Sequence, residues 1–213
     1  KVHATTVTIG DCRMRSFTVP PEQWLFARLY LGIFRPRRPI LGMELAGIVE
    51  ATGRHATRFK PGDAVFASTF EVGFGAYAEY KCMPEGGLIA HKPTNLSFGE
   101  AAAAVGGGMT ALRCLQRGKI QPGQKVLING ASGGVGTLAV QIAKAFGAEV
   151  TGVCSTANVD LVRSLGADHV VDYTREDFTA GPRRYHFLLD NVGNRKLSEY
   201  RRALEPKGMY LAS

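Results

Sequence analysis

A glycine-dense turn between two apolar segments constrains the fold of this chain more than any other feature. The segment KVLINGASGGVGTLAVQIAKAFG covers residues 125–147. Its opening residues predict a buried strand, and apolar residues then recur at helical spacing until Gly147 ends the helix. Ala131, Gly133 and Gly136 take the three positions of a dinucleotide-binding fingerprint, with alanine at the first. Such a turn, directly between a strand and a helix, predicts a pyrophosphate site at the helix N-terminus.

The alternation of strands and helices continues to the end of the chain. The segments EVTGVC, HVVDY, HFLLDNVG and GMYLAS predict strands, and NVDLVRSLG predicts a short helix that ends at Gly166. Strands that alternate with helices imply parallel β-α-β units. The predicted fold class is therefore α/β, with a doubly wound parallel sheet in residues 99–213.

Residues 1–98 have a different pattern, in which short β-type runs are separated by turns. The runs are KVHATTVTI, LAGIVEATG, DAVFAS, AYAEYKC and GLIAHKP, and the turns contain KPGD, PEGG and KPTN. They predict a small, mostly β, barrel-like unit. Residues 24–31 are expected to form a helix or an ordered loop whose aromatic side chains pack in the core.

The net charge of +8 does not indicate a nucleic-acid partner. Residues 1–113 carry 13 basic and 9 acidic side chains, and residues 114–213 carry the same numbers, so the chain has no basic tail. The densest cluster, FRPRRP at residues 34–39, predicts a solvated loop, with a patch for a phosphate-bearing partner as the alternative.

Cysteine usage and hydropathy favour a reduced, cytoplasmic protein without a membrane partner. The four cysteines lie far apart and have no metal-ligand spacing. The longest small-apolar run, residues 101–112, is broken by three consecutive glycines. Because the chain opens on KVHATTV and stops in a strand-like run, we expect it to be truncated at both ends.

Six segments in order carry a resemblance to a known family. They are GMELAGIVEATG, RFKPGDAVFA, GAYAEY, MTALRCL, QPGQKVLINGASGGVGTLAVQIAKAFGAEV and SLGADHVVDY. Together they resemble the zinc-independent quinone oxidoreductase branch of the medium-chain dehydrogenase/reductase superfamily. The resemblance implies a GroES-like β domain over residues 1–98, a Rossmann domain over residues 99–213 and an active site in the cleft between them. It also implies a C-terminal segment that returns to the first domain and is absent from this sequence.

No metal is expected. Zinc-dependent relatives place their catalytic ligands at the positions that correspond here to Thr8, Met43 and Gly106. None of these can bind zinc, which needs thiolate, imidazole or carboxylate ligands.

The resemblance implies hydride transfer from NADPH to a quinone or an activated alkene or carbonyl, with the proton supplied by water. It points to Thr8 and Asp11 as catalytic candidates near the nicotinamide. Met43 and Phe74 are candidates to line an apolar acceptor pocket, and plain core positions are the alternative. A non-catalytic NADPH-binding sensor or crystallin-like protein remains open, as does zinc-free use of simple alcohols or aldehydes.

NADPH is expected in preference to NADH. An NAD site usually has a carboxylate at the end of the second strand, where this chain has Cys154, Ser155 and Thr156. We expect the preference to be moderate, because Ala157 stands where relatives often carry a basic residue and Arg163 lies further along the helix. Motif and resemblance together give these cofactor-binding candidates: Thr110, Ser132, Gly133, Gly134, Val135, Gly136, Ser155, Thr156, Asn158, Tyr173, Asn191, Val192 and Gly193.

The expected partner is a small-molecule quinone or enone. Neither nucleic acid nor a membrane is expected, and a homodimer is left open.

Overall fold

The structure, a computed structural model, describes residues 1–19, 21–33, 35 and 37–213. The chain forms two compact units, Lys1–Gly106 and Gly107–Ser213. The boundary between the units falls inside one long helix, α3 (Phe98–Arg117). The expected division of domains between residues 98 and 99 stays a prediction.

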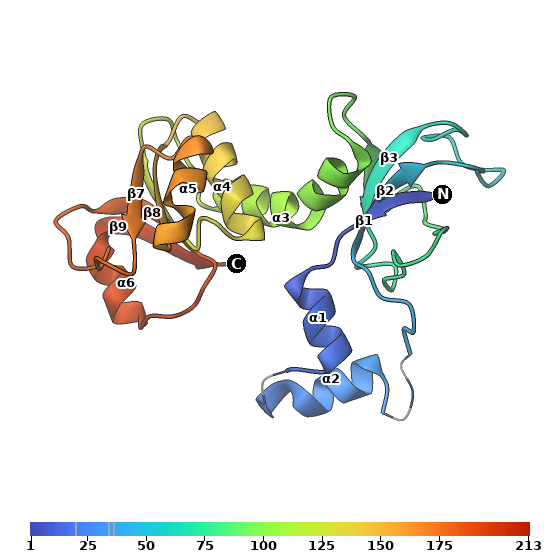
Figure 1. The fold of residues 1–213 in the computed structure, drawn as a ribbon, viewed down its shortest axis with the longest axis horizontal. Coiled ribbons are helices and arrows are strands. Elements are labelled where there is room, and N and C mark those ends of the chain that lie inside the picture. The colour runs from blue at the N-terminus through green and yellow to red at the C-terminus, as the bar shows by residue number, and fades with distance from the viewer. Residues whose placement is uncertain (20, 34, 36) are drawn as a thin grey trace. The chain divides into compact units, whose positions relative to one another are not determined.

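The first unit is built on a four-stranded antiparallel sheet (Figure 1). Its strands pair in the order β1-β2-β3-β4. They are β1 (Val2–Thr5), β2 (Glu44–Ile48), β3 (Ala64–Ser68) and β4 (Ile89–His91). The core side chains are mostly small, and they form two clusters around Leu45, Ala67 and Ala76 and around Ala46, Ala101 and Ala102. The predicted mostly β unit is confirmed.

Of the predicted strands in this unit, one is wrong and another is shorter than predicted. The segment AYAEYKC forms no strand, because its backbone makes single hydrogen bonds to separate places, such as Val2 N to Glu79 O at 2.8 Å. The run over residues 1–9 ends as a strand at Thr5, and α1 (Ile9–Ser16) follows. Thr8 and Asp11 form a capping box at the start of α1, and this local signal competes with the β pattern.

The helix option for residues 24–31 is confirmed, and the core expectation for their aromatic side chains is wrong. A 3-10 turn (Pro21–Gln23) leads into α2 (Trp24–Leu31). Trp24, Phe26 and Tyr30 are 49%, 75% and 62% exposed. In the loop that follows, Arg35, Arg37 and Arg38 are exposed as predicted, and Phe34 and Pro36 lie outside the described residues.

The second unit is a doubly wound parallel sheet, as predicted. Its strand order is β7-β6-β5-β8-β9. All neighbouring strands are parallel. The strands are β5 (Lys125–Asn129), β6 (Glu149–Cys154), β7 (His169–Asp172), β8 (Tyr185–Asp190) and β9 (Leu204–Ala212).

Helices cover both faces of this sheet. Side chains of α3, of α4 (Gly134–Ala145) and of α5 (Val159–Ser164), which follows a 3-10 turn (Thr156–Asn158), share one core with Val126, Ile128 and Val150. Tyr200 and Ala203 of α6 (Leu197–Ala203) pack with Leu127 and Leu188 in a second core. Burial on both faces explains why the central strands β5 and β8 are nearly continuous apolar runs.

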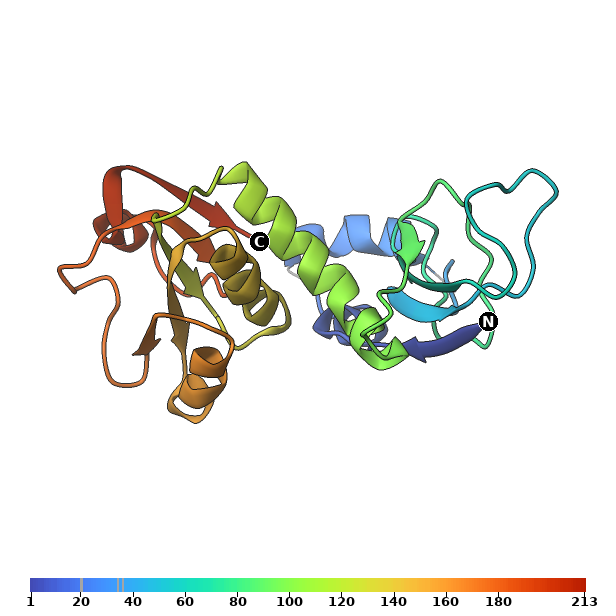
Figure 2. The same ribbon diagram turned by 90° about the horizontal axis from the view of Figure 1, so that it is seen from above.

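The three consecutive glycines of α3 lie inside one helix, and Figure 2 shows that helix uninterrupted. They allow close approach of other atoms. An added Cβ at Gly106 would lie 2.1 Å from Glu44 Oε1, and one at Gly107 would lie 2.4 Å from Gly134 O. None of the helices in the described ranges has the length and apolar character that a membrane crossing requires.

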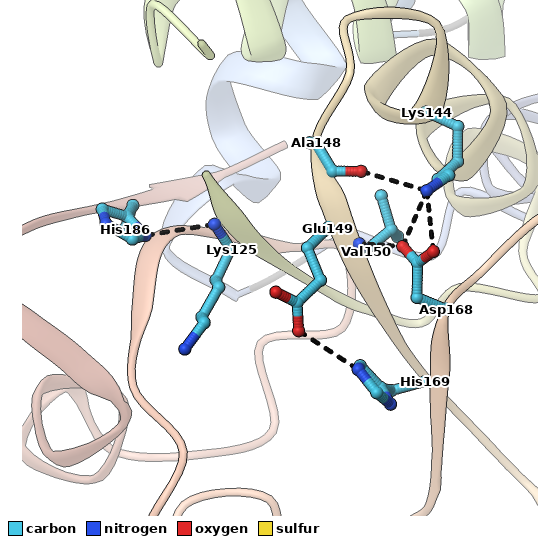
Figure 3. A network of polar contacts seen from close by, with 8 residues as sticks. All are labelled: Lys125, Lys144, Ala148, Glu149, Val150, Asp168, His169 and His186. Atoms are coloured by element: carbon cyan, nitrogen blue, oxygen red, sulfur yellow. Dashed lines mark hydrogen bonds and ion pairs between the residues drawn. The ribbon is translucent and has the colours of Figure 1, made fainter. Parts of the chain in front are cut away.

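Polar contacts fasten the amino edge of the parallel sheet (Figure 3). Lys144 Nζ lies 2.8 Å from both carboxylate oxygens of Asp168, and Asp168 Oδ2 also accepts the Val150 N–H at 2.7 Å. Burial alone would raise the pKa of Asp168, but these hydrogen bonds outweigh it and lower the pKa. His169 Nε2 on β7 lies 3.1 Å from Glu149 Oε1 on the neighbouring strand β6. The opposite, carboxyl edge of the sheet carries the glycine turn.

Candidate functional site

The carboxyl ends of four neighbouring strands bring most of the predicted cofactor residues to one edge of the sheet. Asn129 is in register with Asp190 on β8, and Cys154 is in register with Asp172 on β7. The strand order reverses direction between β5 and β8, and ligands of doubly wound sheets bind at such switch points. The turns at this edge hold Ser132, Gly133, Gly134, Val135 and Gly136 after β5, Ser155, Thr156 and Asn158 after β6, Tyr173 after β7, and Asn191, Val192 and Gly193 after β8.

The turn after β5 has the shape that its glycines predict. Gly130 has a φ of 76°, which favours glycine. An added Cβ at Gly136 would lie 2.1 Å from Gly130 O, so α4 can approach the strand only without a side chain there. At Gly133 the nearest atom to an added Cβ is Gly130 O at 3.4 Å, and at Gly134 there is none within 4 Å. Gly136 is therefore required for close packing of α4 on the strand, and Gly133 and Gly134 leave open space beside the turn.

A dinucleotide fits this turn. Gly133 is the N-cap of α4, and no side chain caps the helix. The N–H groups of the first helical turn and the positive end of the helix dipole are therefore available to an anion. Val135 and Ser132 are half-buried beside the exposed Gly133 and Gly134.

A buried carboxylate lies at the switch point between β5 and β8. Asp190 is 2% exposed, and its Oδ1 accepts hydrogen bonds from Asn129 Nδ2 at 2.9 Å and from the N–H groups of Val192 and Gly193 at 3.0 and 3.1 Å. Its Oδ2 accepts the Tyr210 hydroxyl at 3.0 Å. The carboxylate therefore fixes the turn after β8 to the end of β5.

The pKa values in this network follow from its hydrogen bonds. Burial alone would raise the pKa of Asp190, but donors, with the Tyr200 hydroxyl foremost, outweigh it and lower the pKa. Burial, together with hydrogen bonds to this carboxylate, raises the pKa of Tyr200 and Tyr210. Asp190 is thus held ionised and both tyrosines are held neutral.

The turn after β8 presents an unsatisfied acceptor. Asn191 Nδ2 donates to Asn129 O at 3.0 Å, which holds the side chain against the end of β5. Its Oδ1 is buried and has no hydrogen-bond partner among the residues that the structure describes. Buried polar atoms of native proteins are usually paired, so this oxygen is suited to a donor on a ligand. Val192 is exposed, and Gly193 has a φ of 70°.

The turn after β6 contains the predicted hydroxyl groups. Asn158 Nδ2 donates to Ser155 Oγ at 3.1 Å, which ties these two candidates together. Thr156 Oγ1 donates to Asp172 Oδ2 at 2.5 Å, across from β6 to β7. Tyr173 is 53% exposed, and its N–H donates to Cys154 O at 3.1 Å.

Sequence reasoning named Tyr173 but missed Asp172, Thr174 and Arg175 at this position. The residue that ends β7 places a carboxylate beside the Ser-Thr pair, although β6 itself ends without one. Thr174 donates to Asp172 Oδ1 through its hydroxyl at 2.7 Å and its N–H at 3.0 Å, and Arg175 lies 3.5 Å from Oδ2. The sequence feature that could have identified Asp172 is its position at the end of a predicted strand, because the ends of β6 and β7 lie side by side in the parallel sheet.

In the first unit, the two catalytic candidates Thr8 and Asp11 contact each other. Thr8 Oγ1 donates to Asp11 Oδ2 at 2.7 Å, and Asp11 Oδ1 accepts the Gly42 N–H at 3.2 Å. The Thr8 N–H also donates to Asp11 at 2.9 Å, and Asp11 is 2% exposed. The carboxylate therefore holds the start of α1 against the segment before β2.

A second buried carboxylate, Glu44, lies in the same unit. Its Oε2 accepts the Thr6 hydroxyl at 2.5 Å, and its Oε1 accepts the Gly106 N–H at 2.9 Å. Burial raises the pKa of Glu44, and these two hydrogen bonds oppose the shift. Burial and the nearby Asp11 charge raise the pKa of Tyr77, whose hydroxyl donates to Thr6 O at 3.0 Å, to about 12.

The remaining candidates have different surroundings. Met43 is half-buried, and Phe74 is 1% exposed and packs edge-on to Phe70, so its side chain is part of the core. Thr110 is half-buried on α3 in the second unit. Within the described part of the chain, no three His, Cys, Asp or Glu side chains gather in a way that could hold a metal ion.

Comparison with protein families gives two matches in the order of the two units. Residues 1–94 match the alcohol dehydrogenase GroES-like domain, and residues 134–212 match the zinc-binding dehydrogenase family. The chain belongs to the medium-chain dehydrogenase/reductase superfamily. Quinone and enone reductases of this superfamily are among its relatives, as the sequence motifs predict.

Relatives of this superfamily member include oxidoreductases from animals, plants and bacteria. The mitochondrial NAD(P)H oxidoreductase RTN4IP1 of Homo sapiens is 37% identical over 203 residues, which are 91% of this chain and 51% of that protein. The 2-methylene-furan-3-one reductase of Solanum lycopersicum is 39% identical over 166 residues, 74% of this chain and 42% of that protein. The quinone oxidoreductase of Coxiella burnetii superposes with a TM-score of 0.86 at 29% identity, over 100% of this chain and 65% of that one. The chain spans about half the length of the curated relatives it matches.

Proposed function

We propose that the protein transfers a hydride from NADPH to a quinone or an activated alkene or carbonyl. The observation that carries this proposal is the turn after β5, where Gly136 is required for packing while Gly133 and Gly134 leave open space at the start of α4. That arrangement suits a pyrophosphate, and the names of relatives supply the acceptor class. They include a 2-methylene-furan-3-one reductase, an alkenal/one oxidoreductase and a quinone oxidoreductase.

The roles of the residues follow from what each can contact. N–H groups of the first turn of α4 bind the pyrophosphate, and Ser155 and Thr156 lie on the side of the adenosine ribose. Asp190 and Asn129 hold the turn after β8 in place, and Asn191 Oδ1 accepts a hydrogen bond from the ligand. The bound nicotinamide cofactor supplies the hydride. Fixed positions and exclusion of water are then the main contributions of the protein.

Thr8 and Asp11 remain the proposed residues near the reacting groups. Because three donors occupy the Asp11 carboxylate, we assign this pair to positioning the backbone of residues 8–11 and assign the proton to water. Met43, which is half-buried, is the proposed contact for the apolar acceptor. Phe74 supports that region from the core.

The proposed reaction does not use zinc. The positions of zinc ligands in relatives hold Thr8, Met43 and Gly106, and a quinone or enone is already electrophilic enough to accept a hydride without a Lewis acid. Metal analysis of the purified full-length protein is expected to give well under one zinc per chain. One bound zinc per chain would contradict this part of the proposal.

The activity is tested with the full-length protein and a panel of quinones, enones and simple aldehydes. We expect NADPH oxidation with the first two classes and little with the third. Tight NADPH binding without turnover on any acceptor would instead indicate the non-catalytic sensor.

We also propose a reducing compartment such as the cytoplasm. Cys12 and Cys82 are exposed and Cys114 and Cys154 are buried, and all four are free thiols in the structure. Fractionation of the source cells would test the compartment, and recovery in an oxidising compartment would contradict it.

A further inference from the structure

A cluster of hydroxyl groups around one carboxylate lies where β6 and β7 end. Asp172 Oδ1 accepts the hydroxyl and the N–H of Thr174, and Oδ2 accepts the hydroxyl of Thr156. The two threonine hydroxyls also lie 3.0 Å apart. The hydrogen bond from Thr156, followed by those from Thr174, lowers the pKa of Asp172, so the carboxylate is ionised at neutral pH.

This carboxylate is poorly suited to recognise a ribose hydroxyl. Both of its oxygens already accept hydrogen bonds, and Arg175 Nε lies 3.5 Å from Oδ2. A carboxylate that selects NADH needs free acceptor positions toward the 2′-hydroxyl and the 3′-hydroxyl. Asp172 therefore acts on its protein neighbours: it accepts hydrogen bonds from Thr156 and Thr174, and it pairs with Arg175.

Arg175 is the cation that stands beside the Ser-Thr pair. Its side chain is 75% exposed, and no hydrogen bond among the described residues involves its terminal nitrogens. Arg175 Nε and Thr156 Oγ1 both lie within 3.5 Å of the same oxygen of Asp172, so the guanidinium is held next to the hydroxyl. A guanidinium with its fork free can bind a phosphate through two parallel hydrogen bonds.

Arg163, the other arginine considered for this role, is engaged elsewhere. It lies on α5, and its Nη1 contacts Asp160 of the same helix at 3.4 Å. The negative charge of Asp172 next to Arg175 also explains why selectivity for a 2′-phosphate would be moderate.

We infer that Arg175, held at the end of β7 by Asp172, is the residue that selects a cofactor with a 2′-phosphate on its adenosine ribose. The inference rests on the proposed function only in that this edge binds a nicotinamide dinucleotide. Relatives often carry a basic residue directly after the Ser-Thr pair, where this chain has Ala157. The inference assigns the role of that residue to Arg175, in the loop after β7.

The test compares adenosine 2′,5′-bisphosphate with adenosine 5′-monophosphate, because the two probes differ only in the 2′-phosphate. Binding to the full-length protein is measured by isothermal titration calorimetry. For Arg175→Ala we expect the affinity for the bisphosphate to fall about three- to fivefold, the upper part of the range for a largely exposed ion pair, with the monophosphate unchanged. Arg175→Lys should retain part of the difference, because charge remains while the fork is lost.

Arg163→Ala is the matched control, since it removes the same charge from an arginine in the last turn of α5 that pairs with Asp160. We expect Arg163→Ala to bind each probe within about twofold of the parent protein, because substitutions at independent sites change such free energies by only a few tenths of a kcal/mol. Raising the salt concentration should weaken bisphosphate binding of the parent protein more than that of Arg175→Ala.

Three results would overturn the inference. One is an unchanged bisphosphate affinity in Arg175→Ala, and another is an equal loss for both probes, which would indicate a structural role only. The third is that the parent protein binds neither probe, which would also remove the dinucleotide site from the proposed function. If the first or second result occurred while the parent bound both probes, the proposed hydride transfer would stand.

Discussion

Asn129 Nδ2 donates a hydrogen bond to Asp190 Oδ1 at 2.9 Å, and this contact joins the two strands between which the order of the parallel sheet reverses. The same carboxylate accepts the N–H groups of Val192 and Gly193 and the Tyr210 hydroxyl. One buried charge therefore connects both turns that face the proposed nicotinamide end. A network of this kind stabilises the fold only while all its members are satisfied.

Removal of this carboxylate is expected to be costly. Asp190→Ala leaves Asn129, two tyrosine hydroxyls and two N–H groups without their acceptor, and the free energy of unfolding should fall by about 3–5 kcal/mol. Tyr210→Phe removes one hydrogen bond of the network and should cost about 1 kcal/mol. Urea denaturation measures both. Equal losses for the two variants would show that the network is not centred on Asp190.

The pKa of Asp190 gives stability an acid dependence. Its folded-state pKa lies below the ordinary value of 3.8, so its contribution to stability is present above that value. The contribution is lost as the pH falls from 3.8 through the folded-state pKa. In a series of urea denaturations from neutral to acid pH, the parent protein should lose more stability below about pH 4 than Asp190→Asn. Identical pH profiles would contradict this assignment.

The parallel sheet could be predicted because its central strands, β5, β6 and β8, are buried on both faces. Burial gives nearly continuous apolar runs such as Val126–Ile128, and the helix ends are marked by Gly147 and Gly166, with φ values of 78° and 98°. Local patterns of this strength depend little on tertiary context.

The first unit was harder to predict, because its elements depend on contacts that sequence spacing does not show. The segment AYAEYKC has the alternation of a strand, but its backbone groups bond to two separate segments, at Val2 and at residues 41–42, and form no ladder. The aromatic residues of α2 have the composition of a core helix and are exposed. In α3, Gly106 and Gly107 interrupt an apolar run, and the close approach of Glu44 Oε1 and Gly134 O explains why glycine stands at these two positions.

The glycine turn offers a test that separates binding from folding. Gly133→Val adds a side chain that meets no atom closer than Gly130 O at 3.4 Å, so the variant should fold and lose at least about tenfold in NADPH affinity by obstruction of the pyrophosphate. Gly136→Val places atoms against Gly130 O and Ala131, and it should lower the free energy of unfolding by more than about 3 kcal/mol. Fluorescence titration and urea denaturation measure the two effects.

Gly181→Ala is the control for the glycine variants. Gly181 lies in the loop before β8, and an added Cβ there meets nothing within 4 Å. Gly181→Ala should change neither the NADPH affinity nor the free energy of unfolding. Unchanged NADPH affinity in a folded Gly133→Val protein would remove the pyrophosphate from this turn.

The candidate site could be predicted where its residues belong to a motif or directly follow a strand that the sequence marks. The glycines and the Ser155-Thr156 pair follow strands whose ends the sequence marks, and the structure places them at one edge. Asp172 and Arg175 could not be assigned in this way, because their position depends on the register of β7 against β6. A charge one strand away is invisible to a search along a single β-α-β unit.

A basic residue added directly after the Ser-Thr pair should increase selectivity for NADPH. Ala157 is exposed in the turn that follows β6, so Ala157→Arg adds a cation without disturbing the core. One charge-assisted hydrogen bond to a 2′-phosphate contributes roughly 1.5–3 kcal/mol, and exposure favours the lower end, so the ratio of NADPH to NADH affinity should rise about tenfold. Ala180→Arg, exposed in the loop before β8, adds the same charge elsewhere and should leave the ratio unchanged. If both variants raised the ratio equally, the gain would come from net charge, and the turn after β6 would not be the site of the 2′-phosphate.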